Sequence, residues 1–203
     1  MTQAAHIIYG LLWISFGLLH SMLADQRLKN AAAHVTGSRY RLVYNLIAIV
    51  HFALVYMIGR LWLAADAVEF SWSPAWQMAS LGLQLLGLGV LVAALMRYDL
   101  GLFSGLAQAK ERSAGIHHAT DNEPLQTAGL HRLVRHPLYL GLFLIIWARV
   151  TNEFALATAI WASIYIVIGT KLEEGRLFAK YGEEYSAYKS KVPMYLPWKI
   201  FRS

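Results

Sequence analysis

Long apolar segments are the feature that most restricts how this chain can fold. A helix needs about 20 mostly apolar residues to cross the ~30 Å hydrocarbon core of a bilayer. Three segments are that long and two are shorter, at residues 5–24, 42–63, 77–97, 137–149 and 154–170. Hydrophobic residues make up 57% of the chain and charged residues only 15%, which is unusual for a water-soluble domain. The sequence therefore predicts an all-α, polytopic integral membrane protein with about five transmembrane helices, folded as a single membrane domain.

The distribution of positive charge between these segments predicts how the chain is oriented. The connection at residues 25–41 carries four Lys or Arg residues, whereas residues 64–76 contain two acidic residues and no basic one. Residues 98–135 and the tail after residue 170 are again rich in Lys and Arg. Basic connections stay in the cytoplasm, so we expect the N-terminus outside and the C-terminus inside, in a bacterial inner membrane. The net charge of +6 is thus interpreted as a topology signal, and no nucleic-acid partner is expected.

Most polar side chains that could carry chemistry lie in two stretches of the predicted cytoplasmic side, residues 98–139 and 171–198. The first stretch includes the polar run HHATDNEPLQ and has no clear apolar period, which is typical of a functional or disordered loop. The second has apolar and aromatic residues at helical spacing on both sides of Gly182, which predicts two short amphipathic helices. The chain has no cysteine, and the adjacent His117 and His118 lack the i, i+4 spacing of a helical zinc pair. No metal site is therefore predicted.

A polar cluster, Arg135-His136-Pro137, stands directly before the fourth apolar segment. Proline suits the first position of a helix, because its missing N–H group costs nothing there and its fixed φ matches helix entry. The helix that follows would point its N-terminus towards the cytoplasmic loop, where it attracts anionic groups such as a carboxylate. The alternative is that the arginine anchors the chain by the positive-inside rule and that the histidine is an ordinary interfacial residue.

Two adjacent carboxylates, Glu173 and Glu174, follow the fifth apolar segment in a tail otherwise rich in Lys and Arg. At a membrane boundary, such a pair could bind a cation, neutralise a sulfonium or an amine, or accept a proton. The alternative is a solvated helix start, in which the helix dipole favours acidic residues in the first turn.

His20 and His51 fall inside the first and second apolar segments. Intramembrane histidines are candidates for function, including haem ligation. From the helical rise, His20 would lie about 6 Å and His51 about 14 Å from the inner face. Because of this difference in depth, the two histidines are poorly placed to ligate the same haem.

Taken together, RLVRHPLYLG at residues 132–141 and LEEGRLFAKYGEEYSAYKSKVPMYLP at residues 172–197 resemble the isoprenylcysteine carboxyl methyltransferase superfamily. Members of this superfamily are integral membrane enzymes that use S-adenosylmethionine. The resemblance covers residues 125–198 and depends on an ordered set: Arg-His-Pro-x-Tyr-x-Gly, a Glu pair, Gly-Glu-Glu-Tyr-x-x-Tyr and a late Val-Pro. Within the superfamily, the stretches HSMLADQRLK, RYRLVYN and YDLGLFSGLAQ are similar to the methanethiol S-methyltransferase branch and to the related NnrU membrane family.

The resemblance implies that the last two apolar segments and the tail enclose the cofactor at the cytoplasmic interface. By motif position, the residues implied to bind S-adenosylmethionine are Leu125, Gln126, His131, Arg135, His136, Pro137, Leu138, Tyr139, Gly141, Glu173 and Glu174. For a thiol or hydroxyl acceptor, the candidate catalytic bases are Glu174, His131 and Asp99. His131 stands where family members commonly have Tyr, and Gly169 stands where carboxyl methyltransferases have an arginine associated with the substrate carboxylate. A prenylcysteine carboxylate is therefore not the expected acceptor.

The resulting hypothesis is a membrane methyltransferase that uses S-adenosylmethionine and acts on a small or lipid-like acceptor, first of all a thiol. Membrane lipids are its expected surroundings. One alternative is a haem-binding NnrU-like membrane protein, an isomerase or a regulator of nitrogen-oxide metabolism, with His20, His51 or His131 as ligands. Others are a carboxyl or lipid methyltransferase and a non-catalytic scaffold. The sequence fixes neither the acceptor nor the oligomeric state.

Overall fold

The computed structural model describes residues 1–107 and 124–198, which are helical apart from turns and connections. In these residues the only β-type pairing is an isolated bridge between Glu69 and Asn152. Four of the helices described are long and apolar enough to cross a membrane, and a shorter apolar helix accompanies them. The prediction of an all-α protein is confirmed for this part of the chain.

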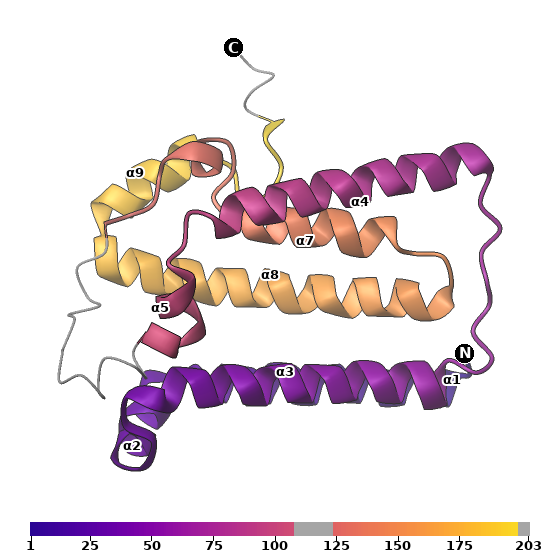
Figure 1. Ribbon diagram of the computed structural model, residues 1–203, viewed down its shortest axis with the longest axis horizontal. Coiled ribbons are helices and arrows are strands. Elements are labelled where there is room, and N and C mark those ends of the chain that lie inside the picture. The colour runs from indigo at the N-terminus through magenta and orange to yellow at the C-terminus, as the bar shows by residue number, and fades with distance from the viewer. Residues whose placement is uncertain (108–123, 199–203) are drawn as a thin grey trace. The chain divides into compact units, whose positions relative to one another are not determined.

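The helices are labelled along the chain in Figure 1. They are α1 (Gln3–Leu23), α2 (Gln26–Thr36), α3 (Tyr40–Ile58), α4 (Pro74–Leu95), α5 (Leu100–Ser104), α7 (Pro137–Ala148), α8 (Glu153–Tyr181) and α9 (Glu183–Lys191), with short turns of helix η1 (Gly37–Arg39), η2 (Gly59–Leu63) and η4 (Gly129–Arg132). The five predicted apolar segments correspond to α1, α3, α4, α7 and α8, whereas no helix was predicted where α2 lies. The tail also differs from expectation, because α8 continues to Tyr181 through a stretch that contains mostly good helix formers and no proline.

The chain divides into two compact units. The first consists of the described residues of Met1–Glu69, Tyr98–Ala119 and Asn152–Ala157. The second consists of those of Phe70–Arg97, Thr120–Thr151 and Thr158–Ser203.

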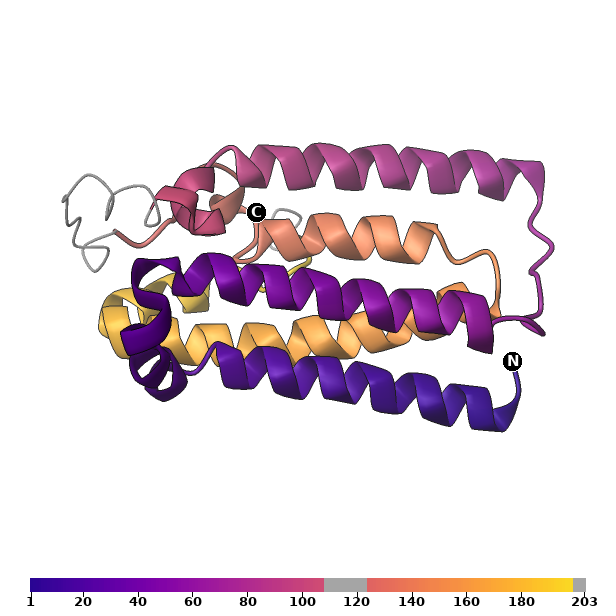
Figure 2. The ribbon, with the colours of Figure 1, turned by 60° about the horizontal axis from the view of Figure 1, so that its bottom comes forward.

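In the first unit α1 and α3 pack side by side, as Figure 2 shows in indigo and violet. Tyr9 of α1 is completely buried and contacts the ring of Phe154, with 5.3 Å between ring centroids. Phe154 also contacts Tyr56 of α3, at 5.6 Å, so aromatic packing joins both helices to the first residues of α8. At the other end of α3, the Asn45 side-chain amide donates to the Ser104 carbonyl at 3.0 Å and holds α5 in place.

In the second unit α7 lies alongside α4 and runs antiparallel to it (Figure 1). Two glycines allow their backbones to approach closely, because a Cβ added to Gly87 would lie 2.9 Å from the Gly141 carbonyl oxygen, and one added to Gly141 would lie 2.8 Å from that of Gly87. On α8, the Ser163 hydroxyl accepts a hydrogen bond from the Trp147 indole of α7 at 3.0 Å. Gly182, with a φ of 54°, ends α8 and turns the chain into α9.

Most apolar side chains of the long helices point away from the protein interior. Only 11% of the apolar stretch of Gly37–Leu63, and the same share of that of α4, is buried within the protein. On α4, Leu81, Leu85 and Leu88 are each at least half exposed. Apolar faces of this extent are stable against hydrocarbon and not against water. The protein is therefore an integral membrane protein.

Candidate cofactor site

The predicted cluster before α7 is held by the backbone of the tail. The Arg135 N–H group donates to the Pro193 carbonyl at 2.8 Å, and the His136 N–H group donates to the Met194 carbonyl at 3.1 Å. These two hydrogen bonds fix the direction in which the side chains of Arg135 and His136 leave the chain. Both side chains then point towards the end of α8.

The Glu174 carboxylate is the centre of a buried charge cluster. One of its oxygens accepts from Arg135 Nε and lies 2.7 Å from both Nε and Nη2 of that guanidinium. The same oxygen lies 3.3 Å from His136 Nε2, and the other oxygen lies 2.8 Å from Lys189 Nζ. Arg135, His136 and Glu174 are each less than a tenth exposed. One carboxylate thus connects the α7 entrance, α8 and α9.

The charge of Arg135 is fully compensated in this interior position. Besides its contacts with Glu174, its guanidinium donates to the carbonyl oxygens of Lys189, at 3.2 Å, and of Val192. A buried ion pair is tolerated only when further hydrogen bonds satisfy its remaining polar atoms. The Arg135–Glu174 pair meets that condition.

Glu173 has a different environment although it is the next residue along the helix. Its side chain is 38% exposed. It accepts a hydrogen bond from the Tyr139 hydroxyl at 3.0 Å and lies 3.8 Å from His136 Nδ1. The rings of His136 and Tyr139 are stacked, with 5.6 Å between centroids and 18° between planes. Glu173 therefore remains accessible to a ligand beside a flat aromatic surface.

His131 is buried next to this cluster. Its Nδ1 lies 3.1 Å from the Arg135 carbonyl oxygen, which can only accept, so Nδ1 carries the proton. The Tyr188 hydroxyl of α9 donates to the His131 carbonyl at 2.7 Å. Burial lowers the pKa of His131 below its ordinary value of 6.5. Burial also lowers the pKa of His136, although Glu173 and Glu174 oppose the shift, so both imidazoles favour the neutral form at pH 7.

The structure brings together most of the residues that the two motifs singled out. Those in mutual contact are Arg135, His136, Tyr139, Glu173 and Glu174, with His131 joined to them through the Arg135 carbonyl. Pro137 is buried as the first residue of α7, and Leu138 follows it half-buried. Gly141 lies against Gly87 of α4, so its contact here is backbone packing.

The contacts described above do not include the other predicted positions. Leu125 and Gln126 lie in the connection before η4, where Leu125 is half-buried and Gln126 is exposed. Asp99 belongs to the first unit. His117 and His118 lie outside the described residues. The cofactor-binding roles of Leu125 and Gln126 and the role of Asp99 as a base stay predictions.

Sequence reasoning missed several residues of the tail. Lys189 reaches Glu174, and Tyr185, one helical turn earlier on α9, is 1% exposed with its pKa raised by burial. The Tyr195 hydroxyl donates to the buried Thr170 hydroxyl at 2.7 Å. The i, i+4 spacing of Tyr185 and Lys189 could have shown that both lie on one helix face. Nothing in the sequence indicates which of the tail carbonyls pair with the α7 entrance.

The two intramembrane histidines lie in the first unit. His20 Nε2 contacts the Tyr44 hydroxyl, and His51 Nε2 lies 3.2 Å from the Ser15 hydroxyl. Across residues 1–107 and 124–198, no three His, Asp or Glu side chains are grouped so as to hold a metal ion. The haem alternative stays a prediction.

Comparison with known proteins relates the chain to methanethiol S-methyltransferases and to Nurim. It is 31% identical to methanethiol S-methyltransferase 1 of Bradyrhizobium diazoefficiens over 98% of this chain and 69% of that protein. It is 33% identical to the methanethiol S-methyltransferase of Mycobacterium tuberculosis over 90% of this chain and 74% of that protein. It is also 26% identical to Nurim of Xenopus laevis over 81% of this chain and 59% of that protein. No protein-family model and no solved structure matches the chain.

The apolar helices and these relatives define an integral membrane protein of the isoprenylcysteine carboxyl methyltransferase-like class, as the ordered motifs predicted. Sequence identity above 30% extends over more than two thirds of the length of several methanethiol S-methyltransferases. The chain belongs to the methanethiol S-methyltransferase family.

Proposed function

We propose that this protein is a membrane methyltransferase that transfers the methyl group of S-adenosylmethionine to a small thiol. Methanethiol is the acceptor in the names of its relatives. The observation that carries the proposal is the contact between the two motif halves. The Tyr139 hydroxyl meets Glu173 across 34 residues of sequence, and His136 meets Glu174 across 38.

The groups at this site suit the polar parts of S-adenosylmethionine. When bound, that cofactor supplies a methyl group on a positively charged sulfonium. The exposed Glu173 carboxylate can accept hydrogen bonds from ribose hydroxyls or an ammonium group. The first turn of α7 has no side-chain cap, so its N–H groups and the helix dipole favour a carboxylate. The stacked rings of His136 and Tyr139 offer a flat surface for a purine.

The two glutamates have separate roles in this proposal. Glu173 binds the cofactor, whereas Glu174, engaged by Arg135 and Lys189, positions His136 and closes α9 over the site. Methyl transfer requires the acceptor and the methyl group to be held close and in line, so rigid positioning contributes directly to the rate. The membrane-embedded helices help to exclude water from the reacting groups.

For a thiol acceptor, we assign the role of base to His131. A base must be available in its unprotonated form, and burial keeps the His131 imidazole neutral at pH 7. Glu174 is held as an anion between two cations, which makes it a weak base. Asp99 belongs to the first unit and stays the third candidate.

We also propose five crossings, with the N-terminus outside and the site at the cytoplasmic face of the inner membrane. The twelve residues of α7 extend only about 18 Å at ~1.5 Å per residue. The connection 149–152 adds about 13 Å if extended, which brings the total close to the hydrocarbon thickness. Two of its carbonyls have partners, because Val150 accepts from the Trp72 indole and Thr151 accepts from the Phe70 N–H group. A non-helical connection at that depth needs such partners.

Binding of S-adenosylhomocysteine tests the cofactor assignment. Full-length protein in detergent would be titrated calorimetrically, alongside Glu173→Gln, His136→Ala and the control Glu183→Gln, which alters an exposed carboxylate at the start of α9. We expect both site variants to lose at least about tenfold in affinity, from lost hydrogen bonds to charged groups, and the control to bind normally. Normal binding by both folded site variants would overturn the assignment.

Methyl transfer tests the acceptor. Labelled S-adenosylmethionine would be supplied with methanethiol, a prenylcysteine and an amine lipid in parallel. We expect the label in the thiol product. A folded protein that binds S-adenosylhomocysteine but labels only the prenylcysteine or the lipid would contradict the thiol assignment and leave the cofactor assignment intact.

A further inference from the structure

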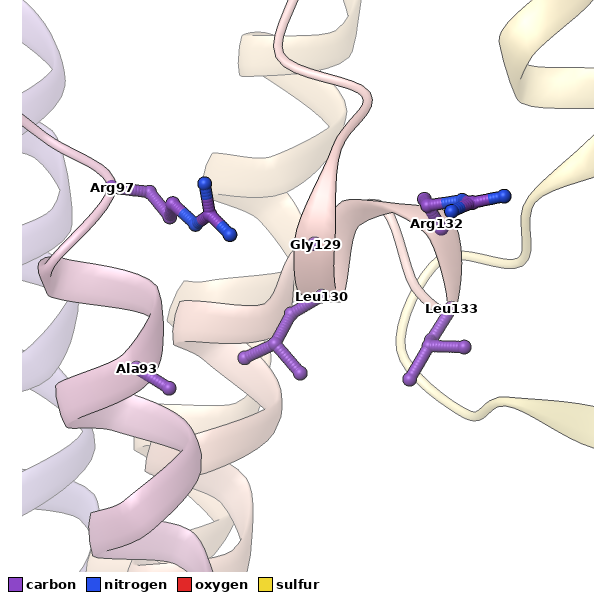
Figure 3. Close-up of a pocket in the computed structure, with 6 residues that line it drawn as sticks. All are labelled: Ala93, Arg97, Gly129, Leu130, Arg132 and Leu133. Atoms are coloured by element: carbon purple, nitrogen blue, oxygen red, sulfur yellow. The ribbon is translucent and has the colours of Figure 1, made fainter.

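A pocket lies in the same unit as the candidate cofactor site. It has a volume of about 710 Å³ and is formed by the end of α4 and the η4 turn (Figure 3). The residues that line it are Ala93, Arg97, Gly129, Leu130, Arg132 and Leu133. None of the roles proposed above uses this pocket.

The pocket has a charged side, formed by Arg97 and Arg132, and an apolar side, formed by Leu130, Leu133 and Ala93. In Figure 3 the Arg97 side chain extends towards Gly129, and Arg132 lies at a similar height with its guanidinium directed away from Arg97. The side chains of Leu130 and Leu133 extend to the opposite side, where Ala93 faces Leu130. Within residues 1–107 and 124–198, neither arginine forms an ion pair. Among the residues that the structure describes, two positive charges without an ion-pair partner therefore border an apolar surface.

The η4 turn is shaped to accommodate Arg97. Gly129 has a φ of 61°, a conformation that suits glycine. A Cβ at this position would lie 3.1 Å from Arg97 Nη2 and 3.3 Å from Cζ, tighter than most real contacts. The missing side chain thus leaves space for the guanidinium against the backbone.

This pocket is on a different side of the η4 turn from the candidate cofactor site. His131 belongs to the same turn, but it is buried, and its ring faces the Arg135 carbonyl. The pocket is lined by its neighbours on both sides, Leu130 and Arg132, and not by His131. The α4 helix ends at Leu95, and Arg97 is two residues further on. The charged side of the pocket therefore lies where a membrane-spanning helix leaves the hydrocarbon.

We propose that this pocket binds an anionic phospholipid of the surrounding membrane. The phosphate would contact Arg97, whose planar guanidinium suits two phosphate oxygens, and Arg132 would add electrostatic attraction at the rim. The first part of an acyl chain would lie along Leu130, Leu133 and Ala93. Basic pockets on the cytoplasmic side of membrane helices bind acidic head groups in this way. A free phosphate ion would use the same charges but not the apolar surface.

Native mass spectrometry of the full-length protein tests the proposal, with dioleoylphosphatidylglycerol and dioleoylphosphatidylcholine as competing probes. We expect the wild type to retain phosphatidylglycerol preferentially and Arg97→Gln to weaken this retention about fivefold, the effect of one basic residue at an anionic surface. Arg97→Lys should keep part of the preference. The control is Arg149→Gln, which removes one positive charge at the C-terminal end of α7, whereas the pocket lies near its N-terminal end. This variant should behave as the wild type. If Arg97→Gln does not fold, Arg132→Gln replaces it, with a smaller expected loss.

Three results would overturn the proposal. Equal retention of phosphatidylglycerol by the wild type and a folded Arg97→Gln variant would show that the pocket does not bind it. Equal thermal stabilisation by inorganic phosphate and by phosphatidylglycerol would show that the lipid chain plays no part. A loss of S-adenosylhomocysteine binding in Arg97→Gln as large as the loss of lipid would assign the pocket to the cofactor.

Discussion

At the scale of single residues, adjacency in sequence does not imply similarity of role. Glu173 and Glu174 are neighbours, but successive residues of an α-helix point about 100° apart. Glu174 is consequently buried against Arg135, whereas Glu173 remains partly exposed beside Tyr139. The sequence predicted that the pair belongs to the site. It could not predict which carboxylate is buried, because that depends on how α8 is rotated against the α7 entrance.

Glu174→Gln is expected to destabilise the protein far more than Glu173→Gln does. Removing one partner of a buried ion pair leaves Arg135 without its counter-charge and typically costs about 3–5 kcal/mol. Glu173→Gln removes a partly exposed charge and should cost at most about 1 kcal/mol. Chaotrope or thermal unfolding of both variants in one detergent measures the difference. Equal stability of the two variants would contradict the roles assigned to these residues.

The buried histidines predict a stability that falls in acid. Burial lowers the pKa of His131 and His136 in the folded protein below the 6.5 of the unfolded chain. Above pH 6.5 both states hold neutral imidazoles, and below it the unfolded chain binds protons first, which favours unfolding. The melting temperature should therefore decrease as the pH is lowered from 7 towards 5. A His131→Asn variant should show a shallower decrease, and an unchanged pH profile in that variant would contradict this explanation.

At the scale of elements, apolar length was sufficient to locate the long helices but not their packing. The α4–α7 contact depends on Gly87 and Gly141, where any side chain would meet the opposite backbone. Gly141 was predicted as a cofactor contact from its place in the motif, and its position against α4 gives it a packing role as well. The α2 helix was missed because it has no long apolar stretch, and the extension of α8 was missed because its apolar stretch ends before the helix does.

Gly141→Ala is expected to destabilise the second unit, because its Cβ would lie within 3 Å of backbone atoms of Gly87 and Leu91. Gly169→Ala on α8 is a matched control, since nothing lies within 4 Å of an added Cβ. In the control, the helix propensity of alanine should stabilise the protein by about 0.5–1 kcal/mol. Melting temperatures of both variants measure the contrast. A Gly141→Ala variant as stable as the wild type would show that α4 and α7 can separate at no cost.

At the scale of the whole molecule, the charges of the connections between helices predict the orientation in the membrane. The sequence contains no cysteine, so a single introduced cysteine can report on which side of the membrane it lies. Single cysteines would replace Asp66, Lys29 and Glu183 in otherwise unchanged protein. In intact cells a membrane-impermeant maleimide should label Asp66→Cys. It should label Lys29→Cys and Glu183→Cys only after the membrane is opened. Labelling of all three in intact cells, or of Glu183→Cys alone, would contradict five crossings with this orientation.

The hydrogen bonds from Arg135 and His136 to the carbonyls of Pro193 and Met194 also constrain biosynthesis. Every helix that surrounds the site precedes Pro193 in the chain, so each leaves the ribosome before the residues that close the site. Membrane insertion and formation of the site are therefore separate events in time. A chain stopped after Lys191 should insert with the normal orientation yet fail to bind S-adenosylhomocysteine. The nascent protein would therefore be inserted in the membrane before its site could form.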